Sequence, residues 1–328
     1  MIVRPAMQSD LSALEQFNAF MYPERKNVKS LLSFWITKNK DAISDVIVMS
    51  DEEDSINGQV IASKMSYYFQ DKIVDSAWLF DLIVLPELKK TAQGAMLMMY
   101  CKKHYPTSCS TGANPNAREM HLKLGNKELG EIRKYVRIGS PLRCLASLFR
   151  KEINVNCFPK SIKTKYGLFD RITDTDSIPT LISPYNRRLF EPCRDVEYLK
   201  WRFFNKLHEY GVYYDPITND YFVVRTIVKF KVLCLVLVDY RCSLEDTSRI
   251  NSILDAMDIF AQKKKIGILI SGSSLHQFDE VLERRHFRSI GRPRPILGFV
   301  DVKDVQESIH KRDFCFITLA DSDGETNL

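Results

Sequence analysis

Apolar and polar positions alternate with two different periods in the first part of the chain. Between residues 11 and 21 apolar side chains recur every three or four positions, which predicts a helix with one buried face. The segments 59–68 and 73–84 are rich in β-branched and aromatic residues and predict strands. The full prediction is strands at 2–4, 46–49, 59–68, 73–84, 108–111 and 131–138, and helices at 11–21, 28–37, 86–104 and 115–124.

The second part of the chain repeats this order of elements without obvious sequence identity to the first. Its predicted strands are 166–172, 212–214, 220–228, 231–239, 266–271, 296–300 and 314–319, and its predicted helices are 174–182, 196–204, 244–262 and 273–285. We therefore expect an α/β protein with two copies of one fold, each a mixed, mainly antiparallel central sheet flanked by helices. The expected domains are 1–140 and 166–328.

The segment 141–165 between the two expected domains is a basic linker. Nine basic residues between Arg133 and Lys165 face one acidic residue, Glu152. Such a run is typical of a solvated surface. Because the stretch 142–151 is weakly amphipathic, contact with a membrane surface or with a phosphate group is the alternative interpretation.

Composition narrows the class of partner. The 328 residues carry a formal net charge of +6, which is modest for a nucleic-acid-binding protein and suits an anionic small ligand equally well. The eight cysteines are scattered, with no CxxC pair and no histidine cluster, so we expect reduced thiols and no metal site. The first residues lack the unbroken apolar region of a signal peptide, and the longest apolar run, 232–238, is too short to cross a membrane. These features predict a cytoplasmic protein without a transmembrane segment.

The segment 78–97 has the order strand, tight turn, helix. In this arrangement backbone N–H groups and the positive end of a helix dipole converge on a phosphate. The turn reads LPELKKTAQGAML and resembles motif A of the GNAT superfamily of acyl-CoA N-acyltransferases, in which it holds the CoA pyrophosphate. Aligning the Pro-Glu pair places Lys89 at the basic position, Ala92 at the first glycine and Gly94 at the second.

A second stretch, residues 114–125, resembles motif B of the same family, Asn-x-x-Ala-x-x-x-Tyr-x-Lys-x-Gly-Phe. His121 stands at the family's tyrosine, and Asn126 stands at its closing phenylalanine. The start IVRPAMQSDLSAL resembles the family's first strand and helix, so the resemblance covers most of residues 1–140. The second half is similar more faintly and has no glycine-rich turn after Asp239, so we expect it not to hold CoA in the usual way.

The resemblance implies direct acyl transfer to an amine, which needs a base, donors for the oxyanion and a proton for the departing thiolate. Asp81 is the candidate base. His121 is the candidate proton donor, because an unperturbed imidazole exchanges a proton near neutral pH. The expected cofactor-binding residues are Leu82, Val84, Lys89, Lys90, Thr91, Ala92, Gln93, Gly94, Ala95 and Asn114. The alternatives are a surface pair for Asp81 and a surface or core-edge position for His121.

Segments 198–203 and 316–324 look like parts of tandem GNAT proteins seen among bacterial surface-polysaccharide genes. Because a cleft between two halves of a protein is a common place for a ligand site, Trp201 and Arg202 on the second half's helix are candidate substrate contacts, with core packing as the alternative. The leading hypothesis is an acetyl-CoA-dependent N-acyltransferase acting on a small-molecule amine such as an amino sugar. The alternatives are a catalytically inactive GNAT-like scaffold and an aminoacyl-tRNA-dependent transferase, the second of which the moderate net charge disfavours.

Overall fold

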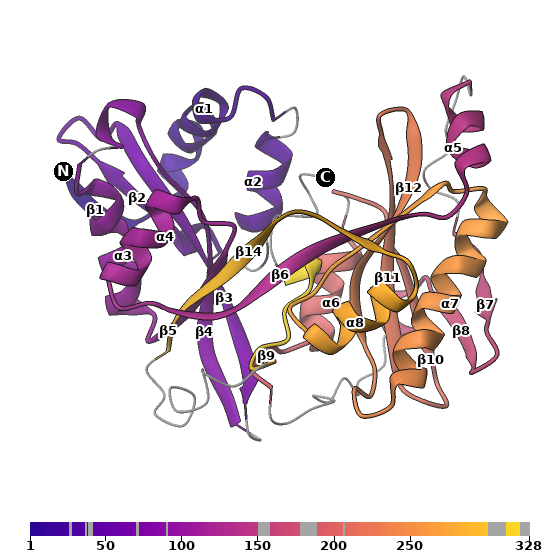
Figure 1. The fold of residues 1–328 in the computed structure, drawn as a ribbon. Helices are drawn as coiled ribbons and strands as arrows, with labels where there is room; N and C mark the ends of the chain where they lie inside the picture. The colour runs from indigo at the N-terminus through magenta and orange to yellow at the C-terminus, as the bar shows by residue number, and fades with distance from the viewer. Residues whose placement is uncertain are drawn as a thin grey trace. The chain divides into compact units, whose positions relative to one another are not determined.

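The computed structural model describes residues 1–25, 28–36, 38, 42–69, 72–89, 91–149, 158–177, 189–205, 207–300 and 313–321 (Figure 1). The described residues form two compact units. Unit 1 comprises the described residues within 1–67, 72–129 and 295–300. Unit 2 comprises those within 68–69, 130–294 and 313–321.

Each unit completes its sheet with a strand from the other half of the sequence. β14 (Arg288–Val300) ends in unit 1, where its last residues pair antiparallel with β5 (Thr107–Thr111). β6 (Lys127–Ile138) ends in unit 2, where its last residues pair antiparallel with β13 (Ile268–Ser271). The units are therefore not consecutive stretches of the chain, whereas the domains expected from the sequence are.

Unit 1 has the sheet order β1-β2-β3-β4-β5-β14, in which β4 and β5 run parallel and β1, β2 and β3 run antiparallel to their neighbours. Its further elements are β1 (Ile2–Pro5), β2 (Val46–Ser50), β3 (Ile56–Phe69), β4 (Lys72–Val84), α1 (Leu11–Met21), α2 (Val28–Ile36), α3 (Gln93–His104), α4 (Pro115–Lys123) and the 3-10 turns η1 (Gln8–Asp10), η2 (Ala42–Asp45) and η3 (Pro86–Leu88).

The helices of unit 1 cover both faces of its sheet because neighbouring residues of a strand point to opposite sides. Leu79 of β4 packs in a core with Leu97 of α3. The next residue, Phe80, lies on the other face, where its ring centroid is 4.2 Å from that of Trp35 of α2. α3 and α4 lie side by side (Figure 1), joined by a hydrogen bond from Lys102 Nζ to the carbonyl of α4's C-cap residue.

Unit 2 has the sheet order β6-β13-β12-β11-β10-β8-β7, with β12 and β13 parallel and the other paired strands antiparallel. Its further elements are β7 (Ser161–Lys163), β8 (Leu168–Ile172), β9 (Glu191–Pro192), β10 (Gly211–Asp215), β11 (Asp220–Lys229), β12 (Val232–Arg241), α5 (Pro141–Leu148), α6 (Val196–Phe203), α7 (Thr247–Lys264), α8 (His276–Arg284) and the 3-10 turns η4 (Thr175–Ser177) and η5 (Leu319–Asp321).

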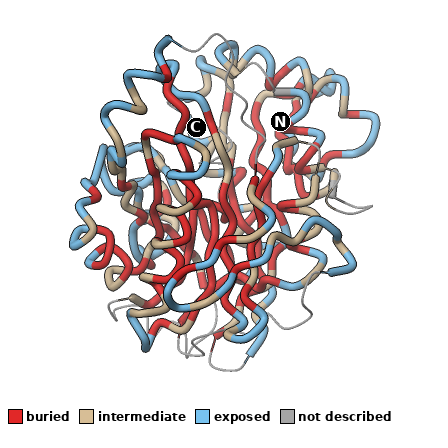
Figure 2. Tube along the Cα trace, turned by 90° about the vertical axis from the view of Figure 1, so that its right-hand side faces the viewer, coloured by how far each residue is buried: buried red, intermediate tan, exposed pale blue. Residues whose placement is uncertain are grey.

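The same alternation builds the two faces of unit 2. Tyr240 of β12 stacks on Phe278 of α8, with ring centroids 4.4 Å apart, in an apolar core. Its neighbours Asp239 and Arg241 are also buried, but they contact Arg194 and Glu191 near the start of α6. Figure 2 shows how the buried residues follow the strands.

The expected fold class is confirmed, since both sheets are mixed, mainly antiparallel and flanked by helices. Several boundaries differ from the expected ones. β6 begins at Lys127 and β14 at Arg288, earlier than expected, while α7 begins later, at Thr247, because Asp246 caps it. The expected strand 314–319 forms only isolated bridges, and the helix expected at 174–182 is described only over η4.

Candidate functional site

The two parallel strands of unit 1 separate near their carboxyl ends. β4 pairs with β5 at Ala77, Trp78 and Leu79, opposite Ser108 to Ser110. β4 then continues to Val84, whereas β5 ends at Thr111. The other edge of β5 pairs with β14. Residues 80–84 therefore extend beyond the part of β4 that is paired with β5. The end of such a parallel pair is where α/β proteins commonly place a ligand.

A strained backbone position in β4 lies just beyond the last pair. Asp81 has a φ of 48°, in the left-handed region that residues with a Cβ adopt at a cost of ~1–3 kcal/mol. Tyr22 Oη donates to Asp81 Oδ1 at 2.8 Å, and Arg25 donates to both carboxylate oxygens at 3.0 and 3.1 Å. The guanidinium also lies 3.6 Å from the centroid of the Tyr22 ring. These contacts hold the strained residue in place.

This geometry gives Asp81 a positioning role. Both of its oxygens accept hydrogen bonds, two of them from a cation, and its side chain is largely buried. These three bonds occupy most of the lone pairs of the carboxylate and fix this part of β4. The role of Asp81 as base stays a prediction.

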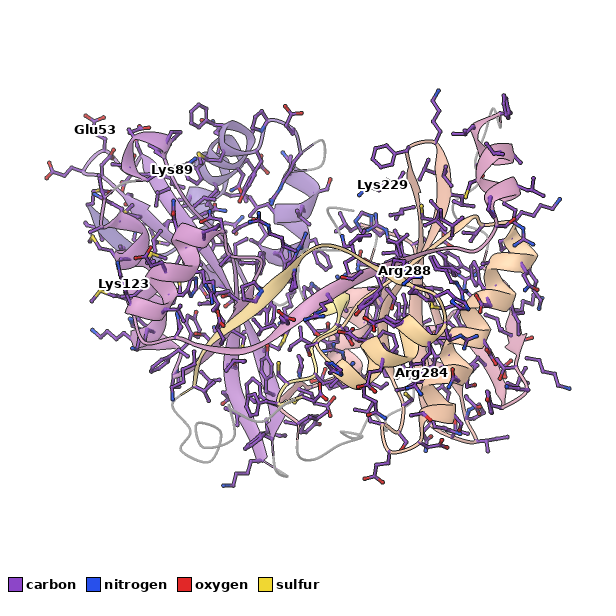
Figure 3. The ribbon with its side chains drawn as sticks, viewed as in Figure 1. Glu53, Lys89, Lys123, Lys229, Arg284 and Arg288 are labelled. Atoms are coloured by element: carbon purple, nitrogen blue, oxygen red, sulfur yellow. The ribbon has the colours of Figure 1, made fainter. Side chains whose placement is uncertain are left out.

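The turn between β4 and α3 presents an uncapped helix start. Ala92 is the N-cap residue of α3, no side chain caps the helix, and its first turn holds no acidic residue. Thr91 Oγ1 donates back to the Leu88 carbonyl and so is turned away from the helix N–H groups. Lys89 is exposed in this turn and labelled in Figure 3. Lys90 lies outside the described residues.

The two positions aligned with family glycines, Ala92 and Gly94, are free of steric conflict within the protein. Ala92 has a φ of −78° and is exposed, so its methyl group creates no backbone strain. A Cβ added to Gly94 would meet Met120 Sδ at 3.7 Å, an ordinary contact. Internal packing therefore does not require a glycine at 94. Contact of Gly94 with a cofactor stays a prediction.

α4 begins as the sequence predicts. Asn114 is its N-cap and accepts a hydrogen bond from the Ala117 N–H at 2.9 Å, with Pro115 in the first turn. Gly125 follows the helix with a φ of 87°, the left-handed conformation for which glycine is favoured. The Asn114 side chain thus has a structural role, and its contact with a cofactor stays a prediction.

His121 is buried at the end of α4. Asn126 Nδ2 lies 2.8 Å from His121 Nδ1, and because an amide nitrogen can only donate, Nδ1 accepts and the proton of the neutral ring sits on Nε2. Burial lowers the pKa of His121 to about 4. The imidazole is therefore neutral at pH 7. The neutral ring can donate a hydrogen bond through Nε2–H, and the role of His121 as proton donor stays a prediction.

The end of α8 in unit 2 has the same backbone hydrogen bond as the end of α4, but with apolar side chains. After α4 the Asn126 N–H donates to the His121 carbonyl at 3.0 Å. After α8 the Phe287 N–H donates to the Leu282 carbonyl at 3.0 Å. Leu282 and Phe287 are buried in the apolar core of unit 2. The fold thus permits an apolar pair where unit 1 has a buried polar pair. A polar pair that the fold does not require favours a functional reason for His121.

The two candidate substrate contacts lie in unit 2. Arg202 has no exposed surface, and it donates to the Ala320 carbonyl at 2.9 Å and to Tyr210 Oη at 3.0 Å. In this structure it is a core residue and does not face a ligand, which corrects the prediction. Trp201 is half-buried, with its ring centroid 5.9 Å from that of Tyr198. Its contact with substrate stays a prediction.

The residues that sequence reasoning missed are Tyr22 and Arg25. They follow α1 and reach Asp81 across 59 and 56 positions of sequence. No local pattern signals such a contact. The sequence alone could have indicated the His121–Asn126 pair, because both positions depart from motif B and lie five residues apart at the end of one helix.

No protein-family model and no curated protein matches the chain. Solved structures do. N-myristoyltransferase from Saccharomyces cerevisiae with bound myristoyl-CoA is 13% identical with a TM-score of 0.59, and the match covers 91% of this chain and 82% of that one. A GCN5-related N-acetyltransferase from Anabaena variabilis is 10% identical with a TM-score of 0.60, over 90% and 72% of the two chains.

A probable N-acyltransferase from Enterococcus faecalis is similar as well, at 11% identity and a TM-score of 0.58 over 90% of this chain and 71% of that one. At these identities the likeness concerns the fold alone. The chain therefore has the GNAT fold of N-acetyl- and N-myristoyltransferases. None of the described helices has the length and apolar content needed to cross a membrane.

Proposed function

We propose that unit 1 binds an acyl-CoA, with acetyl-CoA as the first candidate, and transfers its acyl group to the amine of a small molecule. The observation that carries the proposal is the separation of β4 from β5 next to the uncapped start of α3. Such a helix start offers N–H groups and a positive dipole to a phosphate. The fold shared with N-acyltransferases, one of them holding myristoyl-CoA, supports the same class of cofactor.

Charge at the helix start supports an anionic ligand. Lys89 precedes α3, and no acid lies in the first turn of the helix. A cation at this end opposes the helix dipole, so an isolated helix gains nothing from it. A bound pyrophosphate would give the lysine a partner. We assign Lys89 and the backbone from Thr91 to Ala95 to the phosphates of CoA, with Lys90 as a further candidate.

The chemistry follows from thioester aminolysis. The amine lone pair attacks the thioester carbon, the C–S bond breaks, the amine loses a proton and the sulfur gains one. The backbone N–H groups of Leu82 and Val84 are our candidates for stabilising the oxyanion. We assign to His121 a hydrogen bond from Nε2–H to the departing sulfur, which a neutral imidazole can donate. Asp81, held by Tyr22 and Arg25, fixes the strained backbone of this part of β4.

The acceptor class is the finer part of the proposal. An amino sugar fits the likeness to tandem GNAT proteins that the sequence indicates, and a cytoplasmic site of reaction fits the free thiols found at all seven described cysteines. A panel of amino sugars and other primary amines, assayed for CoA thiol release, tests this part. Activity with every amine except the sugars would remove the amino-sugar assignment and leave the acyltransferase.

Isothermal titration with acetyl-CoA tests the proposed cofactor. We expect binding by the wild type and at least about ten-fold weaker binding by Lys89→Glu, because a phosphate contact is replaced by repulsion. Lys103→Glu is the matched control, since Lys103 is exposed at the opposite end of the same helix and should leave affinity unchanged. No heat and no thermal shift at millimolar acetyl-CoA would contradict the proposal.

A non-catalytic acyl-CoA-binding protein is the second candidate function. The hydrogen bonds that occupy Asp81 and the low pKa of His121 favour it, because a base would compete with Tyr22 and Arg25 and the imidazole is neutral at pH 7. The two functions separate in one assay. Binding of acetyl-CoA without thiol release, over the whole amine panel and from pH 6 to 9, identifies the binding protein.

A further inference from the structure

Helix α5 carries a row of exposed apolar side chains. Leu142, Leu145 and Leu148 recur every three residues, and Phe149 follows directly after the helix with 86% of its surface exposed. A helix on the surface of a soluble domain normally buries such a face. Within the described residues this face of α5 has no cover.

The opposite side of α5 is fixed to unit 2. The N–H groups of Gly139 and Ser140 donate to the Gly267 carbonyl, and Ser140 Oγ caps the helix by accepting from the Arg143 N–H. A Cβ on Gly267 would lie 2.5 Å from Cys144 Sγ, so the glycine permits close packing of the helix. Ser147 is buried. The exposed face is therefore held in a set direction.

A β-hairpin presents a second group of the same composition. The tip between β11 and β12 exposes Val228 and Phe230, and Phe230 is 86% exposed between Lys229 and Lys231. The hairpin and α5 both contact Gly267. Its carbonyl accepts from the residues before α5, and its N–H donates to the Leu233 carbonyl of β12. Figure 1 shows both at one end of unit 2, and Figure 3 labels Lys229 there.

An arginine-lined pocket of about 690 Å³ adjoins α5. Its basic lining comprises Arg137, Arg143, Arg285 and Arg288, against Asp258 as the one acidic lining residue. Its apolar lining residues include Ile138 and Ile290 of β6 and β14. Arg143 belongs to both the pocket and α5, so the pocket and the exposed apolar row are continuous.

Positive charge in this pocket is only partly neutralised. Asp258 pairs with Arg137 and with Arg285, which also binds Asp255. Arg143 donates to the Ala261 carbonyl without a carboxylate partner, and Arg288 is exposed without an ion pair among the described residues. Burial and the charge of Arg285 lower the pKa of Arg137 to about 10. The pocket therefore favours an added anion.

We propose that α5, the β11–β12 tip and the arginine-lined pocket together dock unit 2 on an anionic lipid membrane. Apolar side chains beside lysines and arginines match the boundary between acyl chains and anionic headgroups. The pocket would take a lipid phosphate. A second copy of the chain is the less favourable occupant, because a two-fold contact would bring each arginine cluster against its own copy. We call these three parts the docking surface.

Vesicle sedimentation of the full chain tests the apolar part. Binding is expected with vesicles of phosphatidylcholine and phosphatidylglycerol and not with phosphatidylcholine alone. Leu145→Ser/Phe149→Ser and Phe230→Ser should each lower the partition coefficient by about ten-fold or more, because each removes a large apolar anchor. Ile217→Ser is the matched control, since Ile217 is also 86% exposed, on the turn at the other end of β11. Equal effects of control and test variants would overturn the proposal.

A charge series tests the anionic part. Lys229→Glu and Arg288→Glu should each lower the partition coefficient by at least about five-fold, and rising salt should weaken binding by the wild type. Arg284→Glu is the control, because Arg284 is exposed on α8 and lines no part of the pocket (Figure 3). A thermal shift with inorganic phosphate that Arg288→Glu abolishes, without vesicle binding, would show a free-phosphate site and overturn the lipid assignment.

Two further readouts keep the docking surface separate from the proposed catalytic function. Light scattering of wild type and Leu145→Ser/Phe149→Ser should give the same molar mass, whereas a dimer that the variant dissociates would show that a second copy covers the surface. Acetyl-CoA titration should be unchanged in all docking variants. Loss of vesicle binding with intact cofactor binding therefore concerns the membrane alone.

Discussion

Both units place an aspartate near the end of their central strand, bound by a tyrosine and an arginine. In unit 1 Asp81 accepts from Tyr22 and Arg25. In unit 2 Asp239 accepts from Tyr221 at 2.9 Å and from Arg194 at 2.9 Å. The surroundings differ. Asp81 and Arg25 keep some exposed surface, while Asp239 and its partners have almost none.

The difference comes from the segment 313–321, which covers this end of β12. Thr318 Oγ1 donates to Asp239 at 2.8 Å, and Asp321 pairs with Arg194 at 2.6 Å. Ser273, after β13, bridges to Thr318. Unit 2 fills the region beyond its parallel pair with its own side chains. In unit 1 we propose that the corresponding region takes a ligand.

The helices that follow these two strands also differ at their starts. Asp246 is the N-cap of α7, and its carboxylate accepts from the Ser248 N–H at 2.8 Å. Ala92 is the N-cap of α3, and no side chain caps that helix. A carboxylate at the helix start satisfies the N–H groups and repels a phosphate. The comparison explains why unit 2, despite its fold, is not expected to hold CoA.

The largest expected effect is on the buried network of unit 2. Asp239→Asn removes the carboxylate between Arg194 and Arg241, and we expect the free energy of unfolding to fall by about 3–5 kcal/mol, because breaking a buried pair leaves uncompensated charge. Asp81→Asn should cost about 1 kcal/mol, since its partner Arg25 is partly exposed. Urea denaturation measures both, with the exposed Asp170→Asn as control. Equal losses at Asp81 and Asp239 would break the comparison.

The same network should respond to acid. Burial alone raises the pKa of Asp239, but Arg194 and Arg241 lower it to about 2, below the usual 3.8. A carboxylate with a lowered pKa in the folded state stabilises it fully above its unfolded pKa. We therefore expect this contribution to be present above pH 4 and to be lost as the pH falls toward 2. Asp239→Asn should flatten that part of the stability profile.

Next in size is the polar helix end of unit 1. His121→Leu/Asn126→Phe copies Leu282 and Phe287, and at pH 7 its stability should stay within about 1 kcal/mol of the wild type, because both partners are replaced together. Its advantage should appear below pH 6.5 and approach about 3 kcal/mol near pH 4, since the folded state holds His121 neutral to a pKa of about 4 while the unfolded chain binds the proton.

Two measurements complete this test. Thermal unfolding from pH 4 to 7.5 gives the profile, and thiol release at pH 7.5 gives the function. The double variant should lose turnover by at least about ten-fold while keeping its affinity for acetyl-CoA, because a hydrogen bond to the departing sulfur acts in the transition state. An unchanged turnover would assign the polar pair to structure alone.

A smaller effect separates positioning from base catalysis at Asp81. If the carboxylate only fixes the backbone of β4 at this position, Asp81→Asn and Arg25→Met should lower kcat/KM to similar extents, by about ten-fold, and leave the acid limb of the pH–rate profile in place. A base would behave differently. Loss of the acid limb in Asp81→Asn, with a much smaller effect of Arg25→Met, would restore the catalytic assignment.

The smallest effect comes from exchanging the helix starts. Ala92→Asp gives α3 the acidic start of α7, so it should weaken acetyl-CoA binding by about ten-fold while changing stability by less than about 1 kcal/mol. Asp246→Ala should cost about 1 kcal/mol and leave cofactor binding unchanged. Titration and urea denaturation measure the two quantities. Unchanged affinity in Ala92→Asp would remove the helix start of α3 from the cofactor site.

Local patterns were enough to predict most of the elements. The strand 73–84 and the helix 115–124 depend on neighbouring residues, and they lie close to where the sequence places them. The features that the sequence missed share one cause. The strained backbone at Asp81, the exchange of β6 and β14, and the burial of Arg202 depend on residues far away in sequence, for which local periodicity carries no signal.

The sequence by itself determined the α/β class with mainly antiparallel sheets, and it indicated that a strand, turn and helix after Leu79 suit a phosphate. It did so because side-chain period, caps and turn residues act over a few positions. Only the tertiary structure decided that Asp239 is enclosed by the segment 313–321, that burial lowers the pKa of His121 and that Asp81 is held by Arg25. Burial and long-range pairing set those properties, and both exist only once distant segments of the chain pack together.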